Sequence, residues 1–214
     1  MNNTQFDYIV VEGPIGVGKT TLAKRLATTF GSDLMLELPT ENPFLEKFYE
    51  NPRSAALPTQ LHFLFQRVKQ IETLKQADMF RPVHVADFLI EKDRLFAQIT
   101  LNEDELDLYY QVYERMTVDA PEPDLVIYLQ APPDELLKRV AERGRDYEKS
   151  MGFEYLKKVN DAYIEFFYHY DGAPLLIVNT DEFDLAKGDD DYATLLEHIN
   201  GLGTGRHYFN PKAA

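Results

Sequence analysis

The chain has 214 residues, of which 44% are hydrophobic and 13% aromatic, and this favours a folded protein with a sizeable core over a disordered chain. Its net charge of −14 argues against binding to nucleic acids or anionic membranes, because those polyanions would be repelled. The chain has no cysteine, which fits a cytoplasmic location, and no apolar run approaches the roughly 20 residues of a bilayer span.

Short apolar runs alternate with helix-like stretches along most of the chain. Five apolar runs predict buried strands at Tyr8–Val11, Leu34–Leu38, Val83–Ala86, Leu125–Leu129 and Leu175–Val178. Apolar residues at helical spacing predict helices at Thr21–Phe30, Thr59–Ala77, Glu103–Met116 and Pro133–Arg143. We therefore expect an α/β fold, in which a five-stranded parallel sheet is flanked by helices within a single domain spanning residues 1–214.

The segment GPIGVGKT lies between the first predicted strand and the first predicted helix. It satisfies the phosphate-loop pattern G-x-x-x-x-G-K-[ST], and both flanks are those that the pattern requires. Its glycines permit a tight turn whose N–H groups face an anion beside the positive end of a helix. Lys19 is expected to reach the outer phosphates of a nucleoside triphosphate, and the Thr20 hydroxyl to bind Mg²⁺. The expected ATP-binding residues are Gly13, Pro14, Ile15, Gly16, Val17, Gly18, Lys19, Thr20 and Thr21.

Glu37 lies at the carboxyl end of the second predicted strand, at the edge where open α/β sheets bind ligands. A carboxylate at that edge, beside the phosphates, can accept a proton from an attacking hydroxyl. A solvated loop glutamate is the alternative, and position alone does not separate the two.

Two further stretches are similar to the deoxynucleoside kinase family, namely ELPTENPFLEKFYENP after the second predicted strand and LPTQLHFLFQR at the start of the next helix. The resemblance implies a Rossmann-like P-loop kinase fold, with Glu37 as general base, Tyr49 on the deoxyribose 3′-hydroxyl and Gln60 on the base edge. A side-chain amide offers the donor and the acceptor that a purine or cytosine edge requires. Arg67 shares a helix face with Gln60, two turns away.

The stretch LKRVAERGRDYE carries three arginines in an otherwise acidic chain. Arg139 and Arg143 share a helix face, and Gly144 ends that helix before Arg145. The stretch resembles the lid of deoxynucleoside and nucleoside-monophosphate kinases, placed here at residues 139–150. The resemblance implies that the three arginines stabilise the transferred phosphoryl group, because a loose, highly charged transition state depends on positioned cations. Solvated arginines that balance nearby glutamates are the alternative.

Glu148 matches the lid glutamate of the same family, which contacts the sugar 3′-hydroxyl together with the tyrosine. The resemblance therefore implies that Tyr49 and Glu148 bind the sugar jointly and favour a deoxyribonucleoside over a nucleotide. A surface glutamate is the alternative.

The stretch VADFLIEKDRLFAQ departs from the family pattern at one position. Asp87 fits the acidic position, with an expected role at Mg²⁺ either directly or through water. The family arginine that normally orients the catalytic carboxylate is replaced by Phe88. Lys92 or Arg94, about a helical turn later, could take its place.

Asp93 aligns with the family aspartate that pairs with the arginine at the position of Arg67. The resemblance implies that such a pair favours deoxyadenosine, deoxyguanosine or deoxycytidine over thymidine.

Two C-terminal stretches lack a clear helix or strand pattern. The acidic residues 181–191 predict a solvated loop, and GLGTGRHYFNP predicts a tail packed on the surface, since it lacks a preceding strand and a following helix.

The expected function is transfer of the γ-phosphoryl group of ATP, with Mg²⁺, to the 5′-hydroxyl of a purine deoxynucleoside or deoxycytidine. The family resemblance also implies a homodimer. A nucleoside-monophosphate kinase of the thymidylate type is one alternative, although the carboxylate of Glu37 would repel an acceptor that carries its own phosphate. A degenerate kinase fold that binds nucleotides or acts as a scaffold is the other, and Phe88 supports it.

Overall fold

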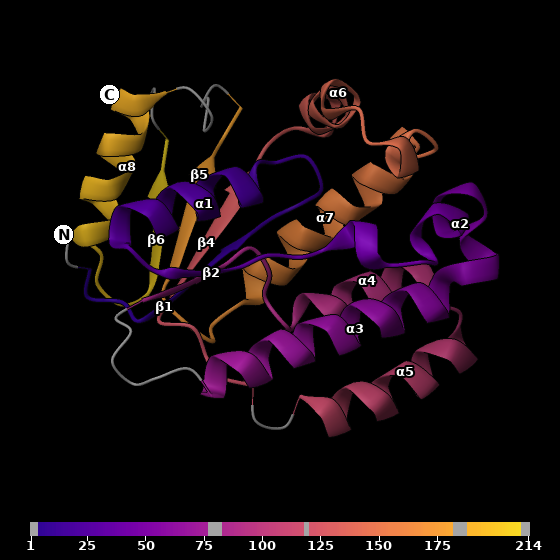
Figure 1. Ribbon diagram of the computed structural model, residues 1–214. Coiled ribbons are helices and arrows are strands. Elements are labelled where there is room, and N and C mark those ends of the chain that lie inside the picture. Colours follow the sequence, from indigo (N-terminus) through magenta and orange to yellow (C-terminus); the bar gives the residue numbers. More distant parts are fainter. Residues whose placement is uncertain (1–3, 77–82, 118–119, 182–187, 211–214) are drawn as a thin grey trace.

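A central parallel sheet organises the computed structural model, which describes residues 4–76, 83–117, 120–181 and 188–210 (Figure 1). Within these residues the sheet has six strands in the order β2-β3-β1-β4-β5-β6, and all of the neighbouring pairs are parallel. The strands are β1 (Tyr8–Glu12), β2 (Asp33–Met35), β3 (His84–Ala86), β4 (Leu125–Gln130), β5 (Leu175–Asn179) and β6 (Arg206–Phe209).

Helices pack on both faces of the sheet, because side chains alternate between the faces along each strand. Val11 and Ile127 face a cluster that includes α1 (Lys19–Phe30), α6 (Pro133–Arg143) and α8 (Asp189–Asn200). Val10 and Val126 face a cluster built with α3 (Pro52–Gln76), α4 (Lys92–Thr100), α5 (Glu103–Met116) and α7 (Phe153–His169). Helix α2 (Leu45–Glu50) and the short 3₁₀ turns Pro39–Glu41 and Asp146–Glu148 complete the described elements.

The predicted α/β class and the five predicted strands are confirmed, but the sheet has a sixth strand and the predicted number is wrong. The second strand is also shorter than expected and ends at Met35, so Glu37 lies in the loop that follows it. The predicted helix at Thr59–Ala77 begins earlier, at Pro52, and continues through Pro58; its predicted end at Ala77 lies outside the described residues.

The C-terminal tail is the sixth strand, which corrects its assignment as surface packing. Strand β6 pairs in parallel with β5, from Leu175 opposite Arg206 to Val178 opposite Phe209. Helix α8 supplies the crossover that such a pair requires. Arg206 Nη2 donates to the carbonyls of Phe167, Tyr168 and Tyr170 at 2.9, 3.0 and 3.2 Å. The Arg206 guanidinium therefore satisfies carbonyl groups at the C-terminus of α7 and has a structural role.

The acidic stretch 181–191 is also only in part a loop. Asp189, Asp190 and Asp191 form the first turn of α8, where negative charge stabilises a helix, and residues 182–187 lie outside the described residues.

Candidate active site

A cavity of about 360 Å³ lies at the carboxyl edge of the sheet. It is lined by the phosphate loop, the segments after β2 and β3, helices α2, α3, α4 and α7, and the turn after α6. Most predicted site residues meet there: Ile15, Gly16, Lys19, Thr20, Glu37, Tyr49, Gln60, Arg67, Asp87, Arg143, Arg145 and Glu148. The structure thus brings the predicted donor and acceptor groups to one space.

The phosphate loop has the backbone conformation that its glycines predict. Gly13, Gly16 and Gly18 have φ values of 148°, 88° and 108°, a region that favours glycine. A Cβ atom at Gly16 would lie 2.8 Å from the Leu136 carbonyl oxygen and 2.9 Å from Cγ2 of Val140. The loop therefore packs directly against α6, and α1 begins at Lys19 with its N-terminus at the loop.

Lys19 lies over this loop. Its Nζ donates to the carbonyls of Gly13 and Pro14 at 2.7 and 3.1 Å. Burial lowers the pKa of Lys19, while the carboxylates of Glu12 and Glu37 oppose that change. The ammonium group is thus held at the mouth of the anion-binding turn.

Asp87 connects the phosphate loop to the acceptor side of the cavity. Its carboxylate accepts from Thr20 Oγ1 at 2.5 Å and from the backbone N–H of Glu37 at 2.8 Å. Burial raises the pKa of Asp87, and the nearby charge of Glu37 raises it further. A hydroxyl and a carboxylate side by side at a phosphate loop are hard oxygen donors, so these residues fit a Mg²⁺ ion bound together with phosphates.

Glu37 contacts two cations inside the cavity. Lys92 Nζ lies 2.8 Å from its Oε2, and Arg67 donates to its Oε1 from Nε at 3.0 Å and also from Nη2. Burial alone would raise the pKa of Glu37, but Arg67, Lys92 and Lys19 outweigh it and hold that pKa well below its usual range. The side chain is therefore an ionised hydrogen-bond acceptor beside the phosphate loop.

Lys92 is a cation on α4 that contacts Glu37. Phe88 is fully buried in the core and cannot carry a charge to Glu37. Arg94 instead lies over the rings of Tyr110 and Tyr113, with its guanidinium carbon 5.4 and 5.9 Å from their centres. Of the two substitutes that the sequence suggests, only Lys92 contacts the catalytic candidate.

The base-contacting candidates divide into two groups. Gln60 and Arg67 line the cavity, and the Gln60 amide has no hydrogen bond to any residue that the structure describes. Asp93 lies outside the cavity lining, is fully buried and forms an ion pair with Arg67 Nη1. The predicted arginine–aspartate pair is confirmed, but Asp93 can act on a ligand only through Arg67.

Tyr49 and Glu148 approach the cavity from two different elements, α2 and the turn after α6. Tyr49 stacks on Tyr147, with ring centres 6.4 Å apart and planes inclined by 14°. Burial raises the pKa of Tyr49, and the charge of the nearby Glu148 adds to this effect. Arg143 donates to both carboxylate oxygens of Glu148, at 3.2 and 2.6 Å, and Arg145 Nη1 lies 3.9 Å from it.

Of the three arginines in the stretch predicted to be a lid, Arg139 does not line the cavity. It donates from Nη2 to the Thr180 carbonyl at 2.6 Å, from Nη1 to the Thr180 hydroxyl at 3.2 Å and from Nε to Glu135 at 2.9 Å. These contacts join α6 to the end of β5. A catalytic role for Arg139 stays a prediction, whereas Arg143 and Arg145 line the cavity.

Sequence reasoning missed several lining residues and one buried charge. The aromatic walls include Phe48, Phe96, Tyr155 and Tyr163, which share their sequence patterns with ordinary core residues. Glu12 is fully buried behind the cavity. A glutamate at the end of the apolar run YIVV was the signal that could have identified it.

A sequence model of the family described as deoxynucleoside kinase matches residues 9–202. The deoxyguanosine kinase of Bacillus subtilis (strain 168) is 35% identical over 210 residues, covering 94% of this chain and 99% of the relative. The deoxyadenosine/deoxycytidine kinase of the same strain is 29% identical over 199 residues, covering 89% and 90%.

A solved structure of deoxyadenosine kinase from M. mycoides, with dCMP and dCDP bound, has the same fold. Its TM-score is 0.77 at 24% identity, over 89% of this chain and 99% of that one. These comparisons do not favour the nucleoside-monophosphate kinase or the scaffold alternative. Of the helices within the described residues, none is long and apolar enough to cross a membrane.

Proposed function

The chain belongs to the deoxynucleoside kinase family and phosphorylates a deoxynucleoside at the expense of ATP, and we propose that its acceptor is the 5′-hydroxyl of a purine deoxynucleoside or of deoxycytidine. One observation carries this proposal. The ionised carboxylate of Glu37 and the phosphate loop line the same cavity, and Asp87 links them through hydrogen bonds to Thr20 and to the backbone of Glu37.

On the donor side, the phosphate-loop amides and Lys19 bind the outer phosphates of ATP. The loop residues from Gly13 to Thr21 form this site, and Lys19 exchanges its carbonyl contacts for phosphate oxygens. Thr20 and Asp87 would hold Mg²⁺ beside those phosphates. The bound ion would neutralise part of the negative charge of the ATP phosphates.

On the acceptor side, Glu37 accepts a hydrogen bond from the 5′-hydroxyl and takes its proton as the new O–P bond forms and ADP leaves. A carboxylate with a lowered pKa is a weak base, but the loose transition state develops little charge on the attacking oxygen until late. Glu37 therefore orients the hydroxyl first and takes its proton late in the reaction. Arg143 and Arg145 stabilise the charge on the transferred group.

The remaining lining residues fit the acceptor's base and sugar. The Gln60 amide, which has no hydrogen-bond partner among the described residues, is available for a base edge, and Arg67, held by Asp93, offers further N–H donors to ring acceptors. Tyr49 and Glu148 bind the 3′-hydroxyl, which requires Glu148 to share its oxygens with Arg143.

We also propose that residues 1–214 act as one domain with a lid at residues 139–150, that the protein works in the cytoplasm, and that it forms a homodimer. Helices α3 and α5 are neighbours (Figure 1). The dimer proposal is supported by an exposed apolar side chain on each of them. Phe65 and Leu108 are 50% and 49% exposed there. Light scattering after size exclusion tests it, since a monomer would be inconsistent with the proposal.

An acceptor panel tests the proposed substrate class. Purified protein with ATP and Mg²⁺ is incubated with deoxyguanosine, deoxyadenosine, deoxycytidine or thymidine, and ADP and the nucleoside monophosphate are quantified. We expect product from at least one of the first three at a higher kcat/KM than from thymidine. Preference for thymidine would refute the proposed base selectivity.

The pH dependence of the reaction follows from the state of Glu37. Its pKa lies below the usual value of 4.5, so the base stays ionised through the mildly acidic range. We expect kcat/KM for the deoxynucleoside at saturating MgATP, which reports groups of the enzyme–MgATP complex, to stay level from about pH 8 to about pH 5.5. A pH–rate profile measures this, and an acid limb with its midpoint above 4.5 would be at odds with the charge arrangement.

A further inference from the structure

A buried glutamate lies behind the proposed base and has four partners of its own. Glu12, fully buried at the end of β1, accepts hydrogen bonds from the backbone N–H groups of Gly13 at 2.7 Å and Leu89 at 3.0 Å. It also accepts one from the Tyr163 hydroxyl at 3.0 Å, and Lys92 Nζ lies 3.1 Å from its Oε1. Its orientation is therefore set by the first residue of the phosphate loop and by the segment after β3.

Lys92 bridges this glutamate to Glu37. Its side chain is 2% exposed, and its Nζ lies 3.1 Å from Glu12 and 2.8 Å from Glu37. A single ammonium thus lies between two carboxylates and attracts both, which offsets their mutual repulsion. Since one of them is hydrogen-bonded to Gly13 N–H, a continuous chain of contacts runs from the phosphate loop to the carboxylate of Glu37.

We infer that Lys92 is a positioning residue for Glu37: it holds that carboxylate at a fixed place relative to the phosphate loop, through Glu12. The inference rests on the proposed function of Glu37. The local sequence supports it, because Phe88 fills the core where a cation is missing, and Lys92 is the first residue of α4, one turn later.

The single variant Lys92→Met must be compared with a second variant, because loss of Lys92 leaves the buried carboxylates of Glu12 and Glu37 without their shared partner. Breaking a buried ion pair is strongly destabilising for that reason. Lys92→Met is therefore compared with Lys92→Met/Glu12→Gln, which also removes the buried charge of Glu12. Its single amide oxygen keeps one of the two backbone hydrogen bonds, because Gly13 and Leu89 donate to different oxygens of Glu12. If Lys92 only balances the charge of Glu12, the double variant regains both thermal stability and kcat.

We expect the double variant to regain thermal stability but not activity. Its kcat should stay about 10- to 100-fold below wild type, because small displacements of a reacting group cost up to two orders of magnitude. The KM for the deoxynucleoside should change little. Lys92→Arg, which keeps the cation, should restore part of kcat. Recovery of wild-type kcat in the double variant would overturn the inference.

A double-mutant cycle shows whether Lys92 acts through Glu37. In the Glu37→Gln background, Lys92→Met should lower kcat further by less than about twofold, because coupled sites are non-additive. Additive losses of kcat would overturn only the positioning role of Lys92. Wild-type kcat in Glu37→Gln would overturn both that role and the proposed role of Glu37 as base. The acid limb of kcat/KM should also move to higher pH in Lys92→Met, because one cation that lowers the pKa of Glu37 is gone.

Lys157→Met is the matched control. Lys157 is half-exposed on α7, pairs with Asp161 at 2.7 Å and does not line the cavity. The Lys157→Met variant loses the same charge as Lys92→Met, and we expect its kcat and its pH profile to equal those of wild type.

Discussion

Replacing Glu37 with glutamine is expected to lower kcat about 10²- to 10⁴-fold, the range over which a positioned general base contributes. Glutamine has nearly the same shape as glutamate but cannot take the proton of the 5′-hydroxyl. Arg67 and Lys92 keep their other partners, Asp93 and Glu12, so the cavity should retain its form. The Kd of the deoxynucleoside, measured by calorimetry, should therefore change by less than about tenfold.

Glu41→Gln is the control for this variant. Glu41 is exposed on the same connection between β2 and α2, where it accepts from Gln66 at 3.3 Å, and it lies outside the cavity lining. Its kcat should match that of wild type. Equal losses of binding and kcat in Glu37→Gln would point to a structural role for Glu37 rather than to a base.

Replacing Lys19 with methionine is expected to lower kcat/KM for ATP about 10²- to 10³-fold. This is the usual cost of removing one preorganised group that stabilises charge in a transition state. The loop should keep its backbone, because its turns depend on Gly13, Gly16 and Gly18 rather than on the ammonium. The loss should appear in steady-state kinetics with ATP varied at saturating deoxynucleoside. Melting temperature without nucleotide should be unchanged or slightly higher, because burial opposes the charge of Lys19.

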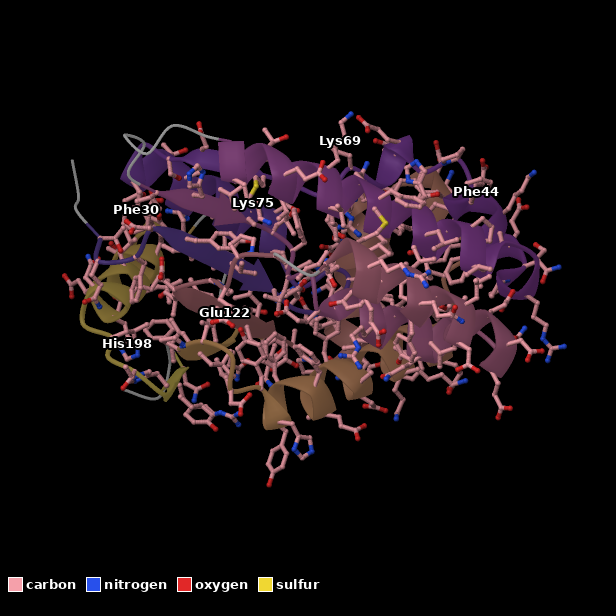
Figure 2. The ribbon with its side chains drawn as sticks, turned by 90° about the horizontal axis from the view of Figure 1, so that it is seen from below. Phe30, Phe44, Lys69, Lys75, Glu122 and His198 are labelled. Atoms are coloured by element: carbon pink, nitrogen blue, oxygen red, sulfur yellow. The ribbon has the colours of Figure 1, made fainter. Side chains whose placement is uncertain are left out.

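Lys69→Met provides the comparison for Lys19→Met. Lys69 is exposed on α3 and projects outward from the molecule (Figure 2). The Lys69→Met variant removes one positive charge from the acidic chain and leaves the cavity lining unchanged. Its kcat/KM for ATP should therefore equal that of wild type. If the two variants behaved alike, net charge rather than the phosphate loop would govern ATP use.

Local signals explain which elements could be predicted from the sequence. The ends of α5 and α6 agree with the prediction, because the α5 N-terminus has an Asn102–Glu105 capping box and Gly144 ends α6 with φ 66°. Helix α7 carries apolar residues at helical spacing, Leu156, Val159 and Tyr163, so it could have been predicted and was missed. Strand β6 could not, because its four residues are defined by non-local pairing with β5.

The site shows the same division between local and non-local signals. The phosphate loop is a contiguous motif, and its geometry follows from its own residues. Lys92 and Asp93 are adjacent, yet one contacts Glu12 and Glu37 while the other pairs with Arg67. Which of them faces the cavity depends on how α4 packs after β3. No spacing rule in a single sequence supplies that orientation, and the same holds for Arg139, which packs against β5.

The central claim is that the Glu37 carboxylate and the phosphate loop accept a neutral sugar hydroxyl between them. The best deoxynucleoside acceptor of the panel and its own 5′-monophosphate differ only in the group presented to Glu37, so ADP formation with each, at equal concentration, tests the claim most directly. We predict conversion of the deoxynucleoside to the monophosphate and no ADP above background with the monophosphate as acceptor, because its charge is repelled by Glu37. Faster ADP formation with the monophosphate than with the deoxynucleoside would contradict the account.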